Sequence, residues 1–141
     1  MKFSLPVLIV CVLILSACAT TRTQRVLDMG DESQLQKRSY QSRIFDTNDK
    51  AKTLRTVIST LQDLGFVIER ADLVLGSVSG TKLDKQNRAR ITVSVRKKGT
   101  DRMLVRANAQ FNVSPVEDPK QYQNFFSSLE KALFLTAHAG E

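Results

Sequence analysis

Apolar residues recur at intervals of three and four between residues 48 and 64. These residues are Ala51, Leu54, Val57, Ile58, Leu61 and Leu64. Because such spacing places side chains on one face of a helix, the pattern predicts a helix over 48–64. Asp46 or Thr47 is expected to cap its first turn, and Gly65 is expected to end it, since glycine accepts the left-handed backbone that often follows a helix. The loosely alternating residues 39–45 predict a short strand before it.

Beyond this helix the period of the pattern changes from 3.6 to two, which is typical of strands. Residues 66–69 and 72–83 form two extended segments, whereas 88–98 and 102–113 are longer runs in which apolar and polar residues alternate. A short turn containing Gly99 joins the two long runs, so they predict a β-hairpin. The inward-facing positions of the second run are Met103, Val105, Ala107, Ala109, Phe111 and Val113.

A second helix is expected to begin after Asp118. Pro119 suits the first helical position, because a proline there loses no hydrogen bond, and the aspartate before it suits the N-cap. The apolar stripe of this helix consists of Tyr122, Phe125, Phe126, Leu129, Ala132 and Leu133. A stripe of this width favours packing on a sheet over lining a ligand pocket. The pattern therefore predicts one α+β domain over 39–141: an antiparallel β-sheet of about four to five strands with two helices packed on one face, in the order β-α-β-β-β-β-α.

The N-terminus has the features of an export signal. Lys2 is followed by the apolar run 5–15, whose 11 residues are too few to span a bilayer as a helix, which takes about 20. Small residues then precede a cysteine in Leu15-Ser16-Ala17-Cys18, a stretch that resembles the lipobox of bacterial lipoproteins. The resemblance implies a signal peptide over 1–17, a diacylglycerol on the thiol of Cys18 and a further acyl chain on its amine. An ordinary secretory signal with a chance cysteine is the alternative.

The segment that follows the signal is expected to act as a lipidated, flexible tether. Residues 18–38 are rich in threonine, glutamine, serine and charged side chains and have no sustained apolar period. Two or more acyl chains hold a protein stably on a membrane lipid surface. Ala19 is not the aspartate that retains lipoproteins on the inner membrane in the best-studied Gram-negative systems. The resemblance therefore implies the periplasmic face of the outer membrane.

A stretch inside the domain carries a second resemblance. Residues 60–66, Thr-Leu-Gln-Asp-Leu-Gly-Phe, followed by Gly76 and Lys82, are similar to a widespread class of small, poorly characterised Gram-negative lipoproteins. The likeness spans about residues 38–138 and implies no activity. The predicted order of elements is also similar to the helix-grip domains of lipoprotein C of the outer-membrane barrel-assembly machine, a likeness of topology alone.

Residues that usually carry catalysis are sparse in this chain. The only histidine is His138, close to the C-terminus, where a solvated side chain is the usual state. The stretch 76–80 has glycines four apart but a valine at its centre, so it lacks the nucleophile of a hydrolase elbow. Once the signal is removed, Cys18 is the only cysteine. We therefore expect a protein that is not an enzyme, with no catalytic residue, no metal site and no cofactor beyond the covalent lipid.

Basic residues concentrate between residues 82 and 106. They are Lys82, Lys85, Arg88, Arg90, Arg96, Lys97, Lys98, Arg102 and Arg106, nine against the two acids Asp84 and Asp101, for a local net charge of +7. Arg90, Arg96, Arg102 and Arg106 fall on the outward face of the predicted hairpin, with Arg96 expected nearly opposite Arg102. This face would bind an anionic partner; the alternative is a solvated surface that keeps the strands from aggregating. Export argues against nucleic acid, as does the lack of base-stacking aromatic residues on this face.

Two classes of function fit these features. The first is a non-catalytic accessory subunit of an envelope assembly or transport machine, which docks an acidic protein surface on the four arginines. The second is a periplasm-facing module that binds a lipid or other anionic small ligand between the sheet and the terminal helix. A pocket there would favour the second class, and a filled core with an exposed basic face would favour the first.

Overall fold

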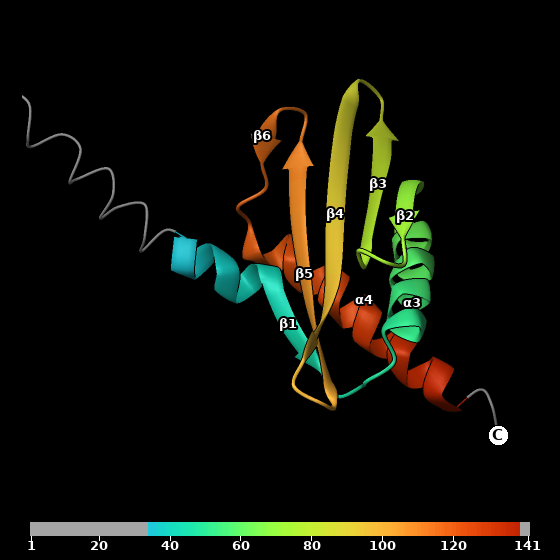
Figure 1. Cartoon of the computed structure of the whole chain (residues 1–141). Coiled ribbons are helices and arrows are strands. Elements are labelled where there is room, and N and C mark those ends of the chain that lie inside the picture. The colour runs from blue at the N-terminus through green and yellow to red at the C-terminus, as the bar shows by residue number, and fades with distance from the viewer. Residues whose placement is uncertain (1–33, 139–141) are drawn as a thin grey trace, which may run out of the picture. The chain divides into compact units, whose positions relative to one another are not determined.

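The computed structural model describes residues 34–138, and these include the whole of the predicted domain up to the last three residues. The predicted signal peptide over 1–17 and Cys18 lie outside the described residues. All the labelled elements lie in one compact unit that begins at Lys37 (Figure 1). In chain order these elements are β1 (Ser42–Phe45), α3 (Lys50–Asp63), β2 (Val67–Asp72), β3 (Ser77–Asp84), β4 (Asn87–Lys98), β5 (Arg102–Phe111), β6 (Ser114–Pro115) and α4 (Pro119–His138).

The strands form one antiparallel sheet in the order β1-β5-β4-β3-β2, and the short β6 pairs with β5. The α+β class and the antiparallel sheet with two helices on one face are confirmed, with six strands instead of four to five. The sixth arises because the strand predicted to run to Val113 ends at Phe111. Asn112 has a positive φ of 55° there, and the chain turns back with Val113 93% exposed, so its predicted inward position is wrong.

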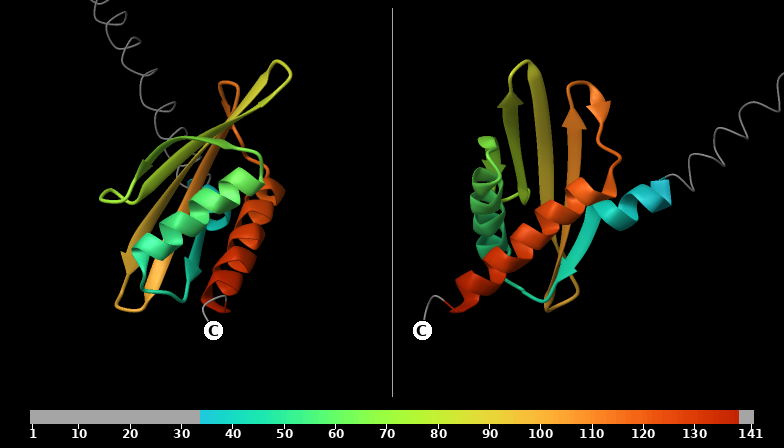
Figure 2. Two further views of the ribbon diagram at one scale, coloured as in Figure 1. Left: turned by 90° about the vertical axis from the view of Figure 1, so that its right-hand side faces the viewer. Right: turned by 180° about the vertical axis from the view of Figure 1, so that it is seen from behind.

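Both long helices lie on the same face of the sheet (Figure 2). The inner face of the central strands is fully apolar, with Val93 and Val95 on β4 and Val105 on β5 all 0% exposed. Against it pack Leu54, Val57 and Leu61 from α3, and Tyr122, Phe125, Phe126 and Leu129 from α4. The alternation seen in the sequence therefore becomes a closed core on one side of the sheet and a polar surface on the other.

Helix α3 begins later than its pattern predicts. The residue that caps it is Asp49, whose carboxylate accepts a hydrogen bond from the backbone N–H of Lys52 at 2.8 Å. The predicted caps, Asp46 and Thr47, lie in the loop before it, where the Thr47 hydroxyl accepts from the backbone N–H of Asp49. The predicted end is confirmed, because Gly65 has a φ of +84°.

A turn interrupts the extended segment predicted over 72–83. β2 continues to Asp72 and β3 begins at Ser77. The chain reverses between them because Gly76 has a φ of +72° and donates its backbone N–H to the carbonyl of Asp72 at 2.9 Å. The side chains of 73–75 therefore lie on a turn and not on a strand.

The N-terminal edge of the domain differs from the prediction. Residues 34–41 are helical, so the expected flexible tether and first strand each lose part of their predicted range. Two contacts hold this helical segment against the domain. The centre of the Tyr40 ring lies 5.3 Å from that of Tyr122 on α4, and Lys37 pairs with Glu117, just before α4, at 2.6 Å. These contacts favour one compact local structure over an extended one.

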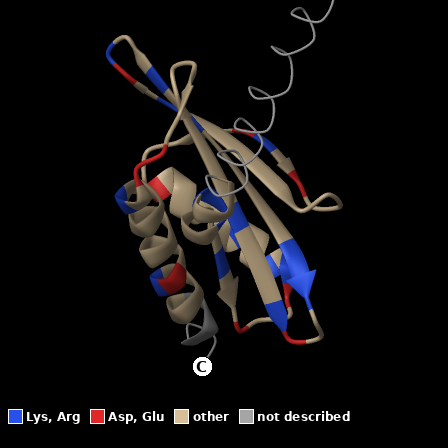
Figure 3. Ribbon diagram, turned by 90° about the vertical axis from the view of Figure 1, so that its left-hand side faces the viewer, with Lys and Arg blue, Asp and Glu red and all other residues tan. Residues whose placement is uncertain are grey.

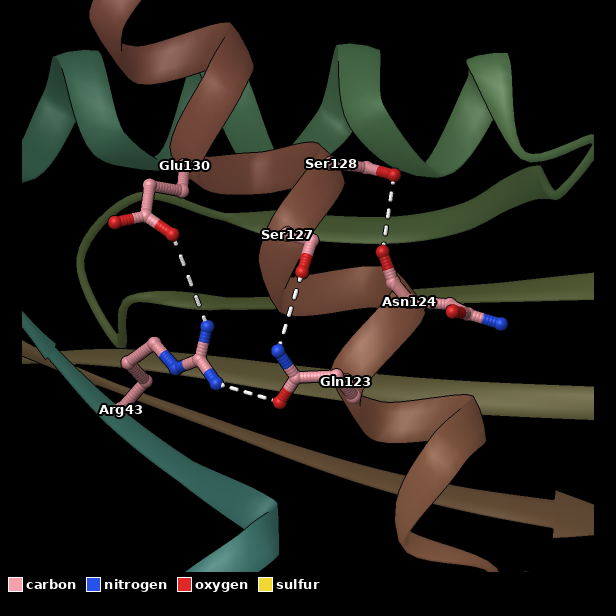
Figure 4. A network of polar contacts seen from close by, with 6 residues as sticks. All are labelled: Arg43, Gln123, Asn124, Ser127, Ser128 and Glu130. Carbon is pink, nitrogen blue, oxygen red and sulfur yellow. Dashed lines mark hydrogen bonds and ion pairs between the residues drawn. The ribbon is translucent and has the colours of Figure 1, made fainter.

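A polar network ties α4 to β1 beside the core (Figure 4). Arg43 donates to the amide oxygen of Gln123 at 2.8 Å and lies 3.9 Å from Glu130. Its guanidinium also stands 5.2 Å from the centre of the Phe126 ring, within the range of a cation–π contact. This arginine is thus occupied on the helix side of the sheet and takes no part in the opposite face.

Candidate functional site

The outer face of the sheet, opposite α3 and α4, carries the predicted arginines. In the β4–β5 hairpin Lys98 pairs with Arg102, Arg96 with Leu104, and Arg106 with Ser94. The expectation that Arg96 lies opposite Arg102 is therefore wrong. The reason is the turn, which spans 99–101 and shifts the pairing, so that these two arginines are diagonal neighbours across the hairpin.

Three of the four arginines form one group with a lysine. We call Arg96, Lys98, Arg102 and Arg106 the cationic cluster; all four side chains are exposed. In Figure 3 blue segments gather where β4 ends and β5 begins, which is where this cluster lies. Among residues 34–138, the only ion pair recorded for its members joins Arg102 to Asp101 at 3.9 Å. The cluster therefore presents a nearly uncompensated positive surface.

An aliphatic pair lies within the cationic cluster. Ile44 on β1 is paired with Leu104 on β5, which in turn faces Arg96 on β4. Ile44 is 39% exposed and Leu104 is half-buried. Arginine around a small apolar centre is a composition enriched at protein–protein interfaces.

Arg90 does not belong to the cationic cluster. Its register partner is Gln110, four positions along the strand from Arg106, and its guanidinium lies 3.6 Å from the carboxylate of Glu69. Arg88 donates to the same carboxylate at 2.9 Å, as does the hydroxyl of Thr81 at 2.6 Å. The sequence prediction of a four-arginine patch is thus replaced by a cluster of three arginines and Lys98, while Arg90 shares the carboxylate of Glu69 with Arg88.

Glu69 on β2 pairs with two arginines of β4, and the sequence pattern did not point to this residue. The hydrogen bond from Thr81, with help from Arg88 and Arg90, lowers the pKa of its carboxyl below the usual value. The pairing of β2 with β3 shifts between Ile68 and Arg70, and this bulge places Glu69 beside Thr81. A single acid in this segment does not predict an ion pair, because its two partners, Arg88 and Arg90, lie on another strand, β4.

The low pKa of Glu69 predicts a defined acid response. An acid with a lowered pKa in the folded state stabilises the fold above its unfolded pKa, about 4.3, and this contribution is lost as pH falls through the folded value. Glu69→Gln should therefore show a smaller loss of stability between about pH 5 and pH 3 than the parent, measured by urea unfolding at each pH. Asp84→Asn is the control, since Asp84 has no recorded ion pair among the described residues. Equal acid slopes for Glu69→Gln and the parent would contradict the prediction.

A cleft of about 460 Å³ opens between the sheet and the first half of α4. Its apolar lining consists of Leu64, Phe66, Ala89, Ile91, Ala109, Phe111, Tyr122 and Phe125, and its polar lining of Lys82, Asp84, Asn87, Gln121 and Asn124. The small side chains of Ala89 and Ala109 leave this space at the end of the core. The stripe of α4 was predicted to pack on the sheet instead of lining a pocket; it packs there, and Tyr122 and Phe125 line the cleft as well.

Two of the polar groups in this cleft already donate hydrogen bonds to backbone carbonyls. The Lys82 amine donates to the backbone carbonyl of Leu64 at 2.9 Å, and the Tyr122 hydroxyl donates to that of Val116 at 2.9 Å. Among residues 34–138 there is no group of three His, Cys, Asp or Glu side chains that could hold a metal ion. The side chain of His138 lies outside the described ones.

No protein-family model matches the chain. No curated protein matches it either. Within the described residues no helix is both long enough and apolar enough to cross a membrane.

Proposed function

We propose that this protein is a non-catalytic lipoprotein of the cell envelope that serves as an accessory subunit of an assembly or transport machine. Lipid on Cys18 anchors it to the periplasmic face of the outer membrane, and its domain docks an acidic protein surface. The observation that carries the proposal is the cationic cluster, whose exposed side chains have Asp101 as their only recorded ion-pair partner among residues 34–138.

The chemistry of the cationic cluster suits carboxylates. A guanidinium is planar and binds a carboxylate with two parallel hydrogen bonds, which fixes orientation as well as charge. Opposite charge across an interface mainly raises the association rate and selects the sign of the partner. Ile44 and Leu104 add a small apolar centre that a partner side chain can cover.

Changing the three clustered arginines to glutamine should weaken partner capture. Arg96→Gln, Arg102→Gln and Arg106→Gln together should leave folding nearly intact, because surface substitutions usually shift stability by less than ~0.5 kcal/mol each. Three exposed ion pairs lost together should weaken binding roughly threefold to 100-fold at low salt. The measurement is affinity capture from crosslinked cells at about 0.1 M and 1 M salt, since the Debye length falls from ~10 Å to ~3 Å over that range.

Arg90→Gln is the matched control for this experiment. It removes an arginine from the same face of the sheet, but one that already pairs with Glu69. It should leave capture unchanged. If the triple variant folds normally, retains every crosslinked partner and complements a deletion strain fully, the cationic cluster is a solvated surface and the proposal fails.

The cleft favours a second candidate, the periplasm-facing module for a lipid or other anionic small ligand. Its volume of about 460 Å³ falls within the range of small-molecule sites, and its lining is mainly apolar with a few polar groups, Lys82 among them. Retained partners in the triple variant, together with an anionic small molecule that copurifies with the protein, would favour this candidate over the first.

A further inference from the structure

The turn between β2 and β3 exposes three consecutive aliphatic side chains. Leu73 is 55% exposed, Val74 88% and Leu75 66%. Single exposed apolar residues are ordinary on protein surfaces, but a contiguous apolar tip marks an interaction site.

Hydrogen bonds with α3, β2 and β4 hold this turn in place. The carboxylate of Asp72 accepts the backbone N–H of Leu75 at 2.8 Å, and the Lys50 amine donates to the carbonyl of Val74 at 2.9 Å. The carbonyl of Gly76 accepts the N–H of Val95 at 2.7 Å. The three aliphatic side chains are thus presented by a fixed backbone.

Only glycine fits at position 76. Its φ is +72°, and an added Cβ would lie 2.5 Å from the Val95 carbonyl oxygen and 2.5 Å from the Lys50 side chain. The apolar turn therefore approaches the end of β4 as closely as the backbones allow. The residues that follow Val95 on that strand are Arg96, Lys97 and Lys98, all exposed.

Cations consequently flank the apolar tip. Lys50 touches the turn itself, Lys97 and Lys98 extend beyond its contact with β4, and Arg70 lies on β2. The acids adjacent in sequence to these cations include Asp49, Glu69 and Asp72. Asp72 lies 4.0 Å from Arg70, whereas Glu69 pairs with Arg88 and Arg90 on β4. In Figure 3 the tan tip of this turn lies beside the blue end of β4.

We infer that the 73–75 turn inserts into the interfacial region of a lipid bilayer that carries anionic headgroups. A fluid bilayer accommodates a protruding aliphatic tip at its interface, and lysines beside the tip are drawn to anionic lipid. This goes beyond the proposed function, because it concerns the 73–75 turn and not the lipid on Cys18, although it shares Lys98 with the cationic cluster. It orients the domain with this turn toward the membrane.

The chain offers a clean optical test, because it contains no tryptophan. Val74→Trp in the full chain makes residue 74 the only indole. The matched control is Val113→Trp, another exposed valine in a turn, located between β5 and β6. Each protein is mixed with vesicles of phosphatidylcholine and phosphatidylglycerol whose acyl chains are brominated or not, and tryptophan emission is recorded.

We expect the emission of the Val74→Trp protein to shift to shorter wavelength and to be quenched by brominated lipid, with little quenching of the Val113→Trp protein. Adding Leu73→Asp and Leu75→Asp to the first protein should abolish the quenching. Lys97→Gln and Lys98→Gln should each weaken docking by about fivefold on anionic vesicles. A Val74→Trp protein quenched no more than the Val113→Trp protein overturns the inference, as does an emission shift that appears with an acidic protein partner but not with vesicles.

Discussion

Leu129→Ala is expected to lower the free energy of unfolding by about 2–5 kcal/mol. Leu129 is 0% exposed and belongs to the core cluster beneath α4, so the substitution removes buried methyl groups and leaves a cavity. Leu61→Ala on α3 should cost a similar amount, because Leu61 is also 0% exposed. A small domain has only ~5–15 kcal/mol in total, so either change should move the urea midpoint strongly.

The same helix supplies the control for this prediction. Leu135 lies on α4 but is 66% exposed, and Leu135→Ala should change stability by less than ~0.5 kcal/mol. Unchanged unfolding of both Leu129→Ala and Leu61→Ala would mean that the two helices do not pack on the sheet as described.

Cys18→Ser is expected to abolish lipid attachment and leave unprocessed precursor in the inner membrane. The serine hydroxyl cannot replace the thiol that carries the diacylglycerol in lipobox proteins. Without two or more acyl chains the mature domain loses its stable membrane anchor. Intact-mass measurement and membrane fractionation test this prediction, and we expect the loss of lipid attachment to be complete.

Cys11→Ser is the matched control, because Cys11 lies inside the apolar run of the predicted signal. It should be processed and lipidated like the parent. If Cys18→Ser and inhibition of the lipoprotein signal peptidase both leave size and fractionation unchanged, the lipoprotein interpretation is wrong, and the ordinary secretory signal takes its place.

Much of the outer face was predictable from alternation alone. The strand period assigned Arg96, Arg102 and Arg106 to one side of the sheet, and the structure places them there. The grouping of those arginines was not predictable, because it depends on the register of the hairpin. A turn centred on residue 100 instead of Gly99 moves each pairing by two positions along the partner strand, and no feature of the β4 or β5 pattern distinguishes these registers.

Ion pairs between strands were likewise not predictable from the sequence. Glu69 binds Arg88 and Arg90 across two neighbouring strand pairings, and its position depends on a bulge in β2. The 73–75 turn was also not predictable from the sequence pattern. Its leucines and valine read as strand residues by composition, whereas Gly76, Lys50 and Asp72 turn the chain and leave them in solvent.

By itself, the sequence determined the class of fold, the two helix faces and the alternation of the long strands. These follow from local periodicity, because buried positions recur at the period of a helix or a strand. The sequence also predicts a lipobox at residues 15–18, because that pattern is local in the chain. Only the tertiary structure decided the hairpin register, the pairing of Arg90 with Glu69, the cleft beside Ala89 and Ala109, and the exposure of residues 73–75. Each of these depends on which residues distant in the chain meet in space, and contact between distant residues leaves no periodic trace along the chain.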